Sequence, residues 1–212
     1  MPELSPQDIE NRSLAIIEAE TPRPRPYGGH QWEIVRRMIH ASADFELLEL
    51  VRFHPNAVSA GVAALREGCL VVTDTEMGRA GIPARRLLAL KAKSACFIGD
   101  PGVSARAVSA GRTRSVYAVD KALEQPQDKI FVIGNAPTAL MRLLERIDGG
   151  APPPALIVGM PVGFVNAAQS KELLMARSDV AYITVAGRKG GTALACAALN
   201  ALAEIALRRD GE

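Results

Sequence analysis

The chain has few aromatic residues, little excess of charge and no long apolar run. Phe, Trp and Tyr make up 4% of the 212 residues, which argues against a stacking platform for single-stranded nucleic acid. Lys and Arg number 25 against 23 Asp and Glu, a net charge of +2, whereas a general DNA-binding protein has a stronger basic excess. No apolar stretch reaches the length of a membrane span.

Cysteine is also scarce. Cys69, Cys96 and Cys196 are odd in number and far apart, which supports neither a disulfide framework nor a C-x-x-C metal site. The three histidines lack the H-x-x-x-H spacing of zinc sites. The first ten residues, MPELSPQDIE, are polar and acidic and do not resemble a signal peptide. We therefore expect a soluble, cytoplasmic protein with no protein-bound metal.

What the chain does have is 48% apolar residues, arranged as short runs that alternate with helical patterns. The pattern predicts helices over 6–20 and 30–43, separated by a proline- and glycine-rich loop at 21–29. Strands are then predicted near 69–74, within 94–102, and near 129–134, 155–160 and 181–187. Helices are predicted near 55–68, 83–93, 102–111, 136–150, 166–177 and 191–209.

Alternating strands and helices indicate a parallel sheet with right-handed crossovers. The strands are almost continuously apolar, as expected when helices cover both faces of a sheet. The sequence therefore predicts a three-layer, doubly wound, Rossmann- or flavodoxin-like α/β fold with a mostly parallel sheet. We expect a single domain over 1–212, with an N-terminal helical segment (1–45) packed outside the sheet and an α/β core (46–212).

Three strands in a row lead into a glycine-bearing loop and then a helix: VIGNAPTAL, IVGMPVGFVNAA and ITVAGRKGGTAL. Ligands of open parallel sheets bind beyond the carboxyl ends of the strands, and helix N-termini attract anions. We therefore expect a ligand with several carboxylates or phosphates. For each loop taken alone, the alternative remains that its glycines serve only the tight turn of the chain after the strand. Neither G-x-G-x-x-G nor the P-loop order occurs, which disfavours a nucleotide site.

Charged residues near these loops have two interpretations. Arg114 and Arg188 either hold ligand carboxylates in a bidentate way or are solvated surface charges, and the sequence weighs both equally. Asp74 and Glu76 follow the strand near 69–74, where they either face the site or cap the next turn. For this acidic pair we favour the capping role.

His40 lies late in the helix predicted over 30–43. Trp32, Val35 and Ile39 form an apolar stripe on that helix, and His40 lies about a hundred degrees round from Ile39, at the edge of the stripe. Its position is compatible with a boundary histidine bonded to backbone or with a catalytic proton donor. The position alone favours the boundary role.

Several long strings occur together and in order: RMIHASADFE, VVTDTEMGRAGI, GRTRS, VIGNAPTAL, GMPVGFVNAAQSKELL and GRKGGTALACAALNAL. In these strings, nearly the whole chain resembles the precorrin-8X methylmutase family, including its cobalt-precorrin-8 branch. The resemblance implies an isomerase of cobalamin (vitamin B12) biosynthesis. Such an enzyme moves a methyl group from C-11 to C-12 of the macrocycle, giving hydrogenobyrinate, or cobyrinate when cobalt is present.

The resemblance also implies a homodimer with active sites near its interface. It assigns the family's proposed acid to His40, an arginine close to the ligand to Arg114, and a helix serine to Ser13. The family's ERS-like string reads NRS here, which leaves the role of Ser13 open. It implies no cofactor. The substrate-binding set predicted from the motifs is Ser13, Thr75, Met77, Arg114, Asn135, Met160, Val162 and Arg188.

An anionic tetrapyrrole explains these features together. Its carboxylate rim suits anion-binding loops and arginines in a chain of low net charge, and its apolar face suits Met77, Met160 and Val162. In this hypothesis His40 acts as a general acid toward the ring. Two alternatives remain: a non-catalytic carrier of the same tetrapyrrole, and a nucleotide-binding enzyme, which the missing fingerprints disfavour.

Overall fold

A central six-stranded sheet organises the computed structural model, which describes residues 5–208. The strand order is β1-β6-β5-β4-β2-β3, and every neighbouring pair is parallel except β1 with β6. The prediction of a mostly parallel sheet is thus confirmed. The strands are β1 (Val51–Phe53), β2 (Leu70–Thr73), β3 (Lys93–Cys96), β4 (Lys129–Ile133), β5 (Leu156–Gly159) and β6 (Tyr182–Val185).

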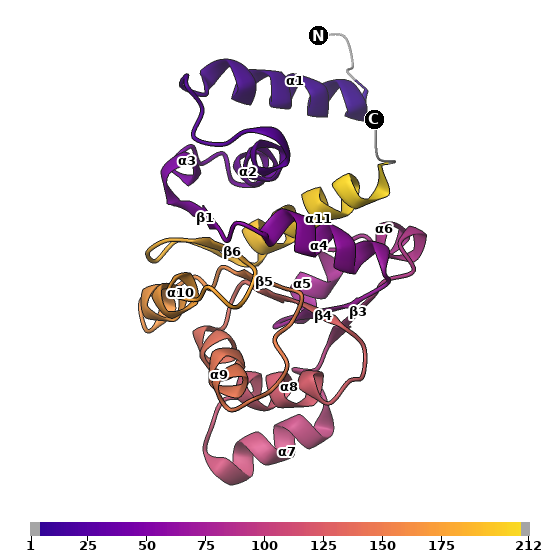
Figure 1. The fold of residues 1–212 in the computed structure, drawn as a ribbon, viewed down its shortest axis with the longest axis vertical. Helices are drawn as coiled ribbons and strands as arrows, with labels where there is room; N and C mark the ends of the chain where they lie inside the picture. Colours follow the sequence, from indigo (N-terminus) through magenta and orange to yellow (C-terminus); the bar gives the residue numbers. More distant parts are fainter. Residues whose placement is uncertain (1–4, 209–212) are drawn as a thin grey trace.

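Helices cover both faces of the sheet, and further helices lie outside those (Figure 1). On one side are α2 (Gly29–Ser42), α4 (Ala57–Arg66), α5 (Glu76–Ala80), α6 (Ala84–Ala89) and α11 (Thr192–Leu207), with α1 (Pro6–Glu20) beyond α2. On the other are α8 (Arg114–Leu123), α9 (Pro137–Asp148) and α10 (Ala167–Met175), with α7 (Pro101–Ala110) outermost. The short α3 (Leu47–Leu50) leads into β1.

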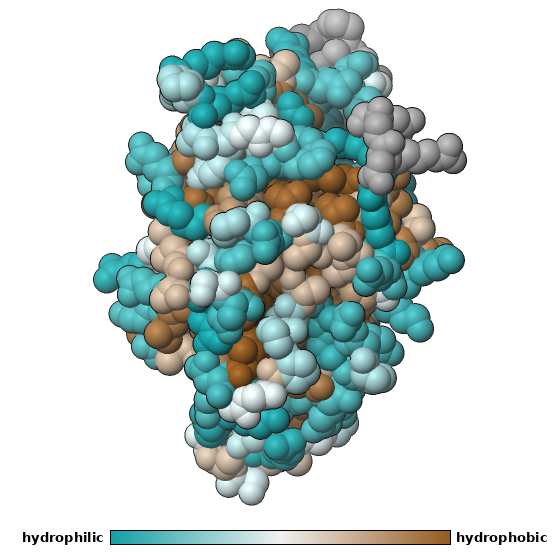
Figure 2. All heavy atoms as spheres, in the orientation of Figure 1, coloured by the Kyte–Doolittle hydropathy of each residue, from teal (hydrophilic) through white to brown (hydrophobic). Residues whose placement is uncertain are grey.

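The strands contribute side chains to two hydrophobic cores, one on each face of the sheet, because successive side chains point to opposite faces. In β4, Ile130 and Val132 join the core on the α11 side, while Phe131 and Ile133 join the core on the α9 side. All four are almost fully buried. This two-sided burial explains the unbroken apolar runs in the sequence. Apolar atoms also gather across the middle of the face in Figure 2, over α4 and α11, between hydrophilic ends.

The two N-terminal helices differ in burial. The stripe predicted on α2 is confirmed, since Trp32, Val35 and Ile39 are buried, and α2 packs on α11. In α1 only Ile17 is buried, so both N-terminal helices lie outside the sheet and α1 is the outer of the two. Its predicted start is also confirmed, because Pro6 is the first helical residue and the Ser5 hydroxyl accepts the backbone N–H of Asp8 at 3.2 Å.

The sequence patterns missed β1, α3, α5 and α8 and set some boundaries too wide. Strand β1 has three residues and pairs antiparallel with the distant β6. The helix predicted over 83–93 is confined to Ala84–Ala89. The last helix ends at Leu207, and position 209 of its predicted range lies outside the described residues, as do 1–4 of the predicted polar N-terminus. Within residues 5–208, no helix is both long and apolar enough to cross a membrane.

Candidate functional site

The loops at the carboxyl ends of the strands are held together by a buried carboxylate. Asp74, just after β2, accepts the backbone N–H groups of Gly134, Asn135 and Ala136 at 3.2, 2.8 and 2.7 Å. Burial raises the pKa of Asp74 above its usual value. The expectation that Asp74 caps the next turn is therefore wrong, because its carboxylate holds the loop after the neighbouring strand β4. The next turn is capped by Thr75, whose hydroxyl accepts the N–H of Gly78 at 3.0 Å.

Glycine allows the β4–α9 loop to reach the start of α11. A Cβ atom at Gly134 would lie 2.5 Å from the Cα of Thr192, so only glycine fits there. Gly78 in α5 packs against Thr73, Thr75 and the same Thr192. The loops after β2 and β4 therefore converge on the first residue of α11.

The β5–α10 and β6–α11 loops are interlocked. The N–H of Gly163 donates to the carbonyl of Arg188 at 3.2 Å, and the N–H of Gly191 donates to the carbonyl of Met160 at 2.8 Å. Gly190, with φ +157°, approaches so closely that a Cβ there would lie 2.2 Å from that Met160 oxygen. The Met160 side chain is fully buried, so Met160 shapes these loops through its backbone.

Other predicted binding residues lie on the surface around these loops. Met77, Val162 and the neighbouring Phe164 are 67%, 45% and 83% exposed, and Asn135 is exposed as well. The Arg188 guanidinium lies 5.5 Å from the centroid of the Phe164 ring. The strand ends thus present apolar side chains beside a cation.

Arg114 is the first residue of α8 and is exposed. It forms no ion pair with a described residue, so its guanidinium is available to an anion. Next to it the hydroxyls of Thr113, Ser115 and Thr138 hydrogen-bond to one another at 2.7–3.2 Å. This cluster joins the start of α8 to the start of α9.

His40 lies in the last turn of α2 and its side chain is exposed. It lines two grooves, each of about 490 Å³. The Ser13 groove also contains Ser13, Ile16, Ile17, Glu20, Ile39, Ala43 and Phe45. The Arg37 groove also contains Pro6, Ile9, Glu10, Arg37, Ala41, Gly81, Ala193, Cys196, Ala197 and Asn200. The structure therefore brings Ser13 and His40 together beneath α1.

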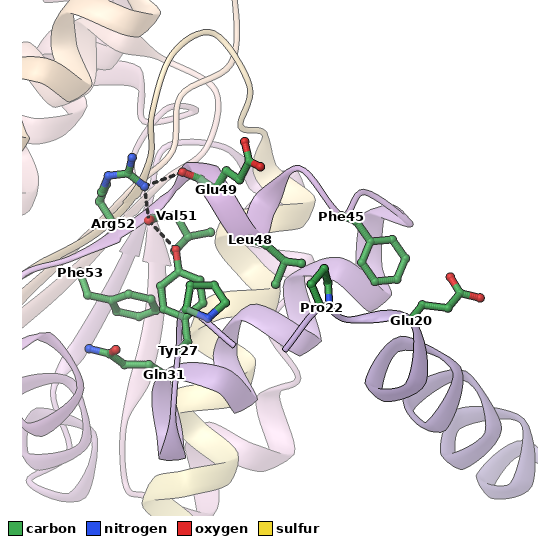
Figure 3. A pocket seen from close by; sticks show the side chains of 11 residues that line it. Glu20, Pro22, Tyr27, Gln31, Phe45, Leu48, Glu49, Val51, Arg52 and Phe53 are labelled. Carbon is green, nitrogen blue, oxygen red and sulfur yellow. Dashed lines mark hydrogen bonds between the residues drawn. The ribbon is translucent and has the colours of Figure 1, made fainter. Parts of the chain in front are cut away.

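A larger groove of about 870 Å³ adjoins the Ser13 groove, with which it shares Glu20 and Phe45. Figure 3 shows Glu20 and Phe45 at one end and Arg52, Phe53 and Tyr27 at the other. The Tyr27 hydroxyl donates to the carbonyl of Val51 at 2.8 Å, and Arg52 donates to the same oxygen. The three grooves follow one another along α1, and His40 lies between the second and the third.

Charged and polar side chains flank the Arg37 groove. Arg37 hydrogen-bonds to Glu10, and to Glu204 at 2.8 Å, and Arg86 also donates to Glu204. The hydrogen bond from Arg37 lowers the pKa of Glu10. Burial raises the pKa of the Cys196 thiol to about 11, so Cys196 stays protonated near neutral pH and is a poor nucleophile.

Two elements connect the His40 grooves to the strand-end loops. Helix α5 has Thr75 as its N-cap, while Gly81, just past its other end, lines the Arg37 groove. Helix α11 starts at Thr192 beside the loops, and Ala193 and Cys196 in its first turns line the same groove. His40 and Ser13 therefore lie together beneath α1, and α5 and α11 connect their grooves to the strand-end loops.

The comparisons with known proteins agree along nearly the whole chain. A family model described as precorrin-8X methylmutase matches residues 8–205. A cobalt-precorrin-8 methylmutase of Priestia megaterium is 42% identical over 203 residues, covering 96% of this chain and 89% of that protein. A precorrin-8X methylmutase of Pseudomonas aeruginosa is 47% identical over 198 residues, covering 93% and 94%. This chain belongs to the precorrin-8X methylmutase family.

A solved structure supports the same family. The crystal structure of a precorrin-8X methylmutase from Thermus thermophilus matches with a TM-score of 0.88 and 41% identity, covering 95% of this chain and 96% of that one. The resemblance identified in the sequence motifs is thus confirmed. Some relatives are named precorrin-8X methylmutase and others cobalt-precorrin-8 methylmutase, and these are 40–47% identical to this chain. Sequence identity therefore does not separate the two branches.

Sequence reasoning missed several residues of the Arg37 groove. Asn200 donates to the carbonyl of Gly81 at 3.0 Å, and its Oδ1 is buried without a hydrogen-bond partner among the described residues. Glu204 lies one turn further along α11. A signal was present, because Asn200 and Glu204 are the polar residues of an otherwise apolar helical stretch and share one face.

Proposed function

We propose that this protein moves a methyl group from C-11 to C-12 of precorrin-8X or cobalt-precorrin-8, giving hydrogenobyrinate or cobyrinate. The family match over residues 8–205 supports this activity, as do relatives named for both substrates. The migration breaks one carbon–carbon bond and forms another within the same molecule. It therefore needs no oxidant, reductant or second substrate.

The observation that carries the catalytic part of the proposal is the placement of His40. Its helix buries Trp32, Val35 and Ile39, yet His40 is exposed and lines two adjoining grooves. As an imidazolium, His40 would donate a proton to a ring nitrogen or its neighbouring π-system. The ring would then be poorer in electrons, which eases the migration. General acid catalysis of this kind typically contributes about 10²–10⁴-fold to the rate.

The other predicted residues would bind the substrate. Arg114 and Arg188 would pair with carboxylates at the rim of the ring, and each charge-assisted hydrogen bond contributes roughly 1.5–3 kcal/mol. Met77 and Val162 would contact its apolar face. Ser13 shares a groove with His40 and would contact the ring from α1.

Thr75, Asn135 and Met160 complete the proposed set. Thr75 and Met160 support the loops through a helix cap and a backbone carbonyl. Asn135 exposes its side chain at the end of β4. A cobalt ion, where present, would arrive bound in the ring and is substrate.

We further propose that the protein acts in the cytoplasm as a homodimer of single-domain chains. Ile9 and Ile16 lie seven residues apart on one face of α1 and are 53% and 49% exposed. A second copy packed on this face would cover both side chains and deepen the grooves beneath α1. Analytical ultracentrifugation of Ile16→Asp should show monomers where the unmodified protein shows dimers, whereas two monomeric samples would contradict the dimer.

The decisive experiment follows the absorption spectrum of the protein mixed with precorrin-8X and, separately, with cobalt-precorrin-8. Conversion by the unmodified protein and by His30→Ala, but not by His40→Ala, would support the methylmutase and the acid. His30 is a matched control, since it is an exposed histidine at the opposite end of α2. Binding of either substrate without conversion would favour the carrier, and full activity of His40→Ala would remove His40 as the acid.

A further inference from the structure

Lys171 of α10 is fully buried, which is unusual for a lysine. No carboxylate among residues 5–208 forms an ion pair with it. Its ammonium donates instead to the backbone carbonyl of Lys189, in the β6–α11 loop. Burying a charged group destabilises a protein unless the group is paired or hydrogen-bonded. This hydrogen bond therefore compensates the buried ammonium and attaches α10 to the loop that carries Arg188.

The side chain of Lys189 extends from the same loop to a different part of the fold. Its ammonium lies 2.7 Å from Asp44 Oδ2 and 3.0 Å from Glu46 Oε2. Asp44 follows directly on the helix that carries His40, since Ala43, with φ +53°, is the C-cap of α2. Lys189 therefore connects the end of the His40 helix to the loop of Arg188.

We propose that Lys189 is a positioning residue for the methylmutase reaction, and this inference rests on the proposed function. Its ammonium fixes the end of the His40 helix relative to the Arg188 loop, and Lys171 fixes that loop from the protein interior. The acid and an anion-binding arginine are thereby kept at a constant separation.

The alternative role of Lys189 is direct binding of a substrate carboxylate. The two roles change different kinetic constants. A direct ligand binds ground state and transition state alike, so its loss raises KM and leaves kcat unchanged. Loss of a positioning residue misplaces the acid and lowers kcat, because small displacements of a reacting group reduce the rate steeply.

The test compares Lys189→Met with Lys189→Arg, which keeps the charge, and with Lys93→Met, an exposed lysine at the start of β3. We expect Lys189→Met to lower kcat about tenfold or more while the affinity for the corrin product changes less than about twofold. Lys189→Arg should restore most of kcat, and Lys93→Met should equal the unmodified protein. Adding Asp44→Asn to Lys189→Met should lower kcat no further, because both changes remove the same contact.

Three outcomes would overturn the positioning role: a raised KM with unchanged kcat in Lys189→Met, unchanged kinetics in that variant, or full additivity with Asp44→Asn. Each of these presupposes that the unmodified protein converts substrate. Failure of the unmodified protein to convert either precorrin would overturn the proposed function itself, and the inference with it. The two failures are therefore distinguishable in one set of assays.

Discussion

The stability of this protein should depend on pH in a way that Lys171 controls. Burial lowers the pKa of Lys171 from 10.5 to about 8. Between these two pH values the unfolded chain holds a proton on Lys171 that the folded protein has released. Because stability rises with pH wherever the unfolded state binds more protons, the contribution of Lys171 to the free energy of unfolding should increase from about pH 8 to pH 10.5.

The expected size follows from the shift. A difference of one pKa unit corresponds to about 1.4 kcal/mol, so the buried ammonium destabilises the folded protein by roughly 3 kcal/mol below pH 8. Lys171→Met removes this titration. At pH 7 two effects on the free energy of unfolding of this variant oppose each other. Removing the buried ammonium raises it, and leaving the Lys189 carbonyl without its hydrogen bond lowers it. The change with pH of the difference in free energy of unfolding between the unmodified protein and this variant depends only on the titration of Lys171, so it is the quantity to measure.

Urea unfolding followed by the fluorescence of the single tryptophan, the buried Trp32, measures this slope. Between pH 7 and 10.5, the stability of the unmodified protein minus that of Lys171→Met should rise by roughly 3 kcal/mol. Lys93→Met, which removes an exposed lysine, should give a difference that stays flat. Parallel curves for the unmodified protein and Lys171→Met would refute the reasoning, since Lys171 would then titrate normally.

Three further predictions concern the strand-end loops and the start of α8. Gly134→Ala should lower the free energy of urea unfolding by about 1–3 kcal/mol, because its Cβ would lie 2.5 Å from the Cα of Thr192. Gly99→Ala is the control, since Gly99 has open space around it. Equal losses of stability in the two variants would contradict the close approach. Asp74→Asn should lower it by about 1–3 kcal/mol, since an amide replaces one acceptor of backbone N–H groups with a donor; an unchanged urea midpoint would contradict this. Arg114→Met should weaken product binding about 10–100-fold without moving the melting temperature, and unchanged affinity in an absorbance titration would remove Arg114 from the site.

The parallel part of the sheet could be predicted because each of its inner strands is buried on both faces. Runs such as Ile130–Ile133 have no polar residue to interrupt them and end at a glycine or a loop. Strand β1 had no such signal, since it is three residues long and follows α3 directly. Its pairing with β6 comes from residues more than a hundred positions away, which no local pattern records.

The motifs located the loops that follow β4, β5 and β6 but could not say which side chains face outward. Met160 and Val162 are both apolar residues after β5, and the sequence assigned both to the ligand. Met160 is fully buried while Val162 is 45% exposed. The difference arises from the interlocking of two loops, where the Met160 carbonyl accepts the N–H of Gly191. That contact joins residues 31 positions apart and is invisible to a local pattern.

The position of His40 shows what the helical wheel decides and what it leaves to the fold. The wheel separated His40 from the buried stripe, and the structure confirms that separation. The groove beside His40, however, is assembled from α1, α2 and α11. At its edge Arg37 hydrogen-bonds to Glu10 and, across 167 positions, to Glu204. A histidine at the edge of a stripe is ordinary. This one lies between two grooves, at a helix end that the Asp44–Lys189 ion pair joins to an arginine-bearing loop, and on this placement we propose it as the general acid.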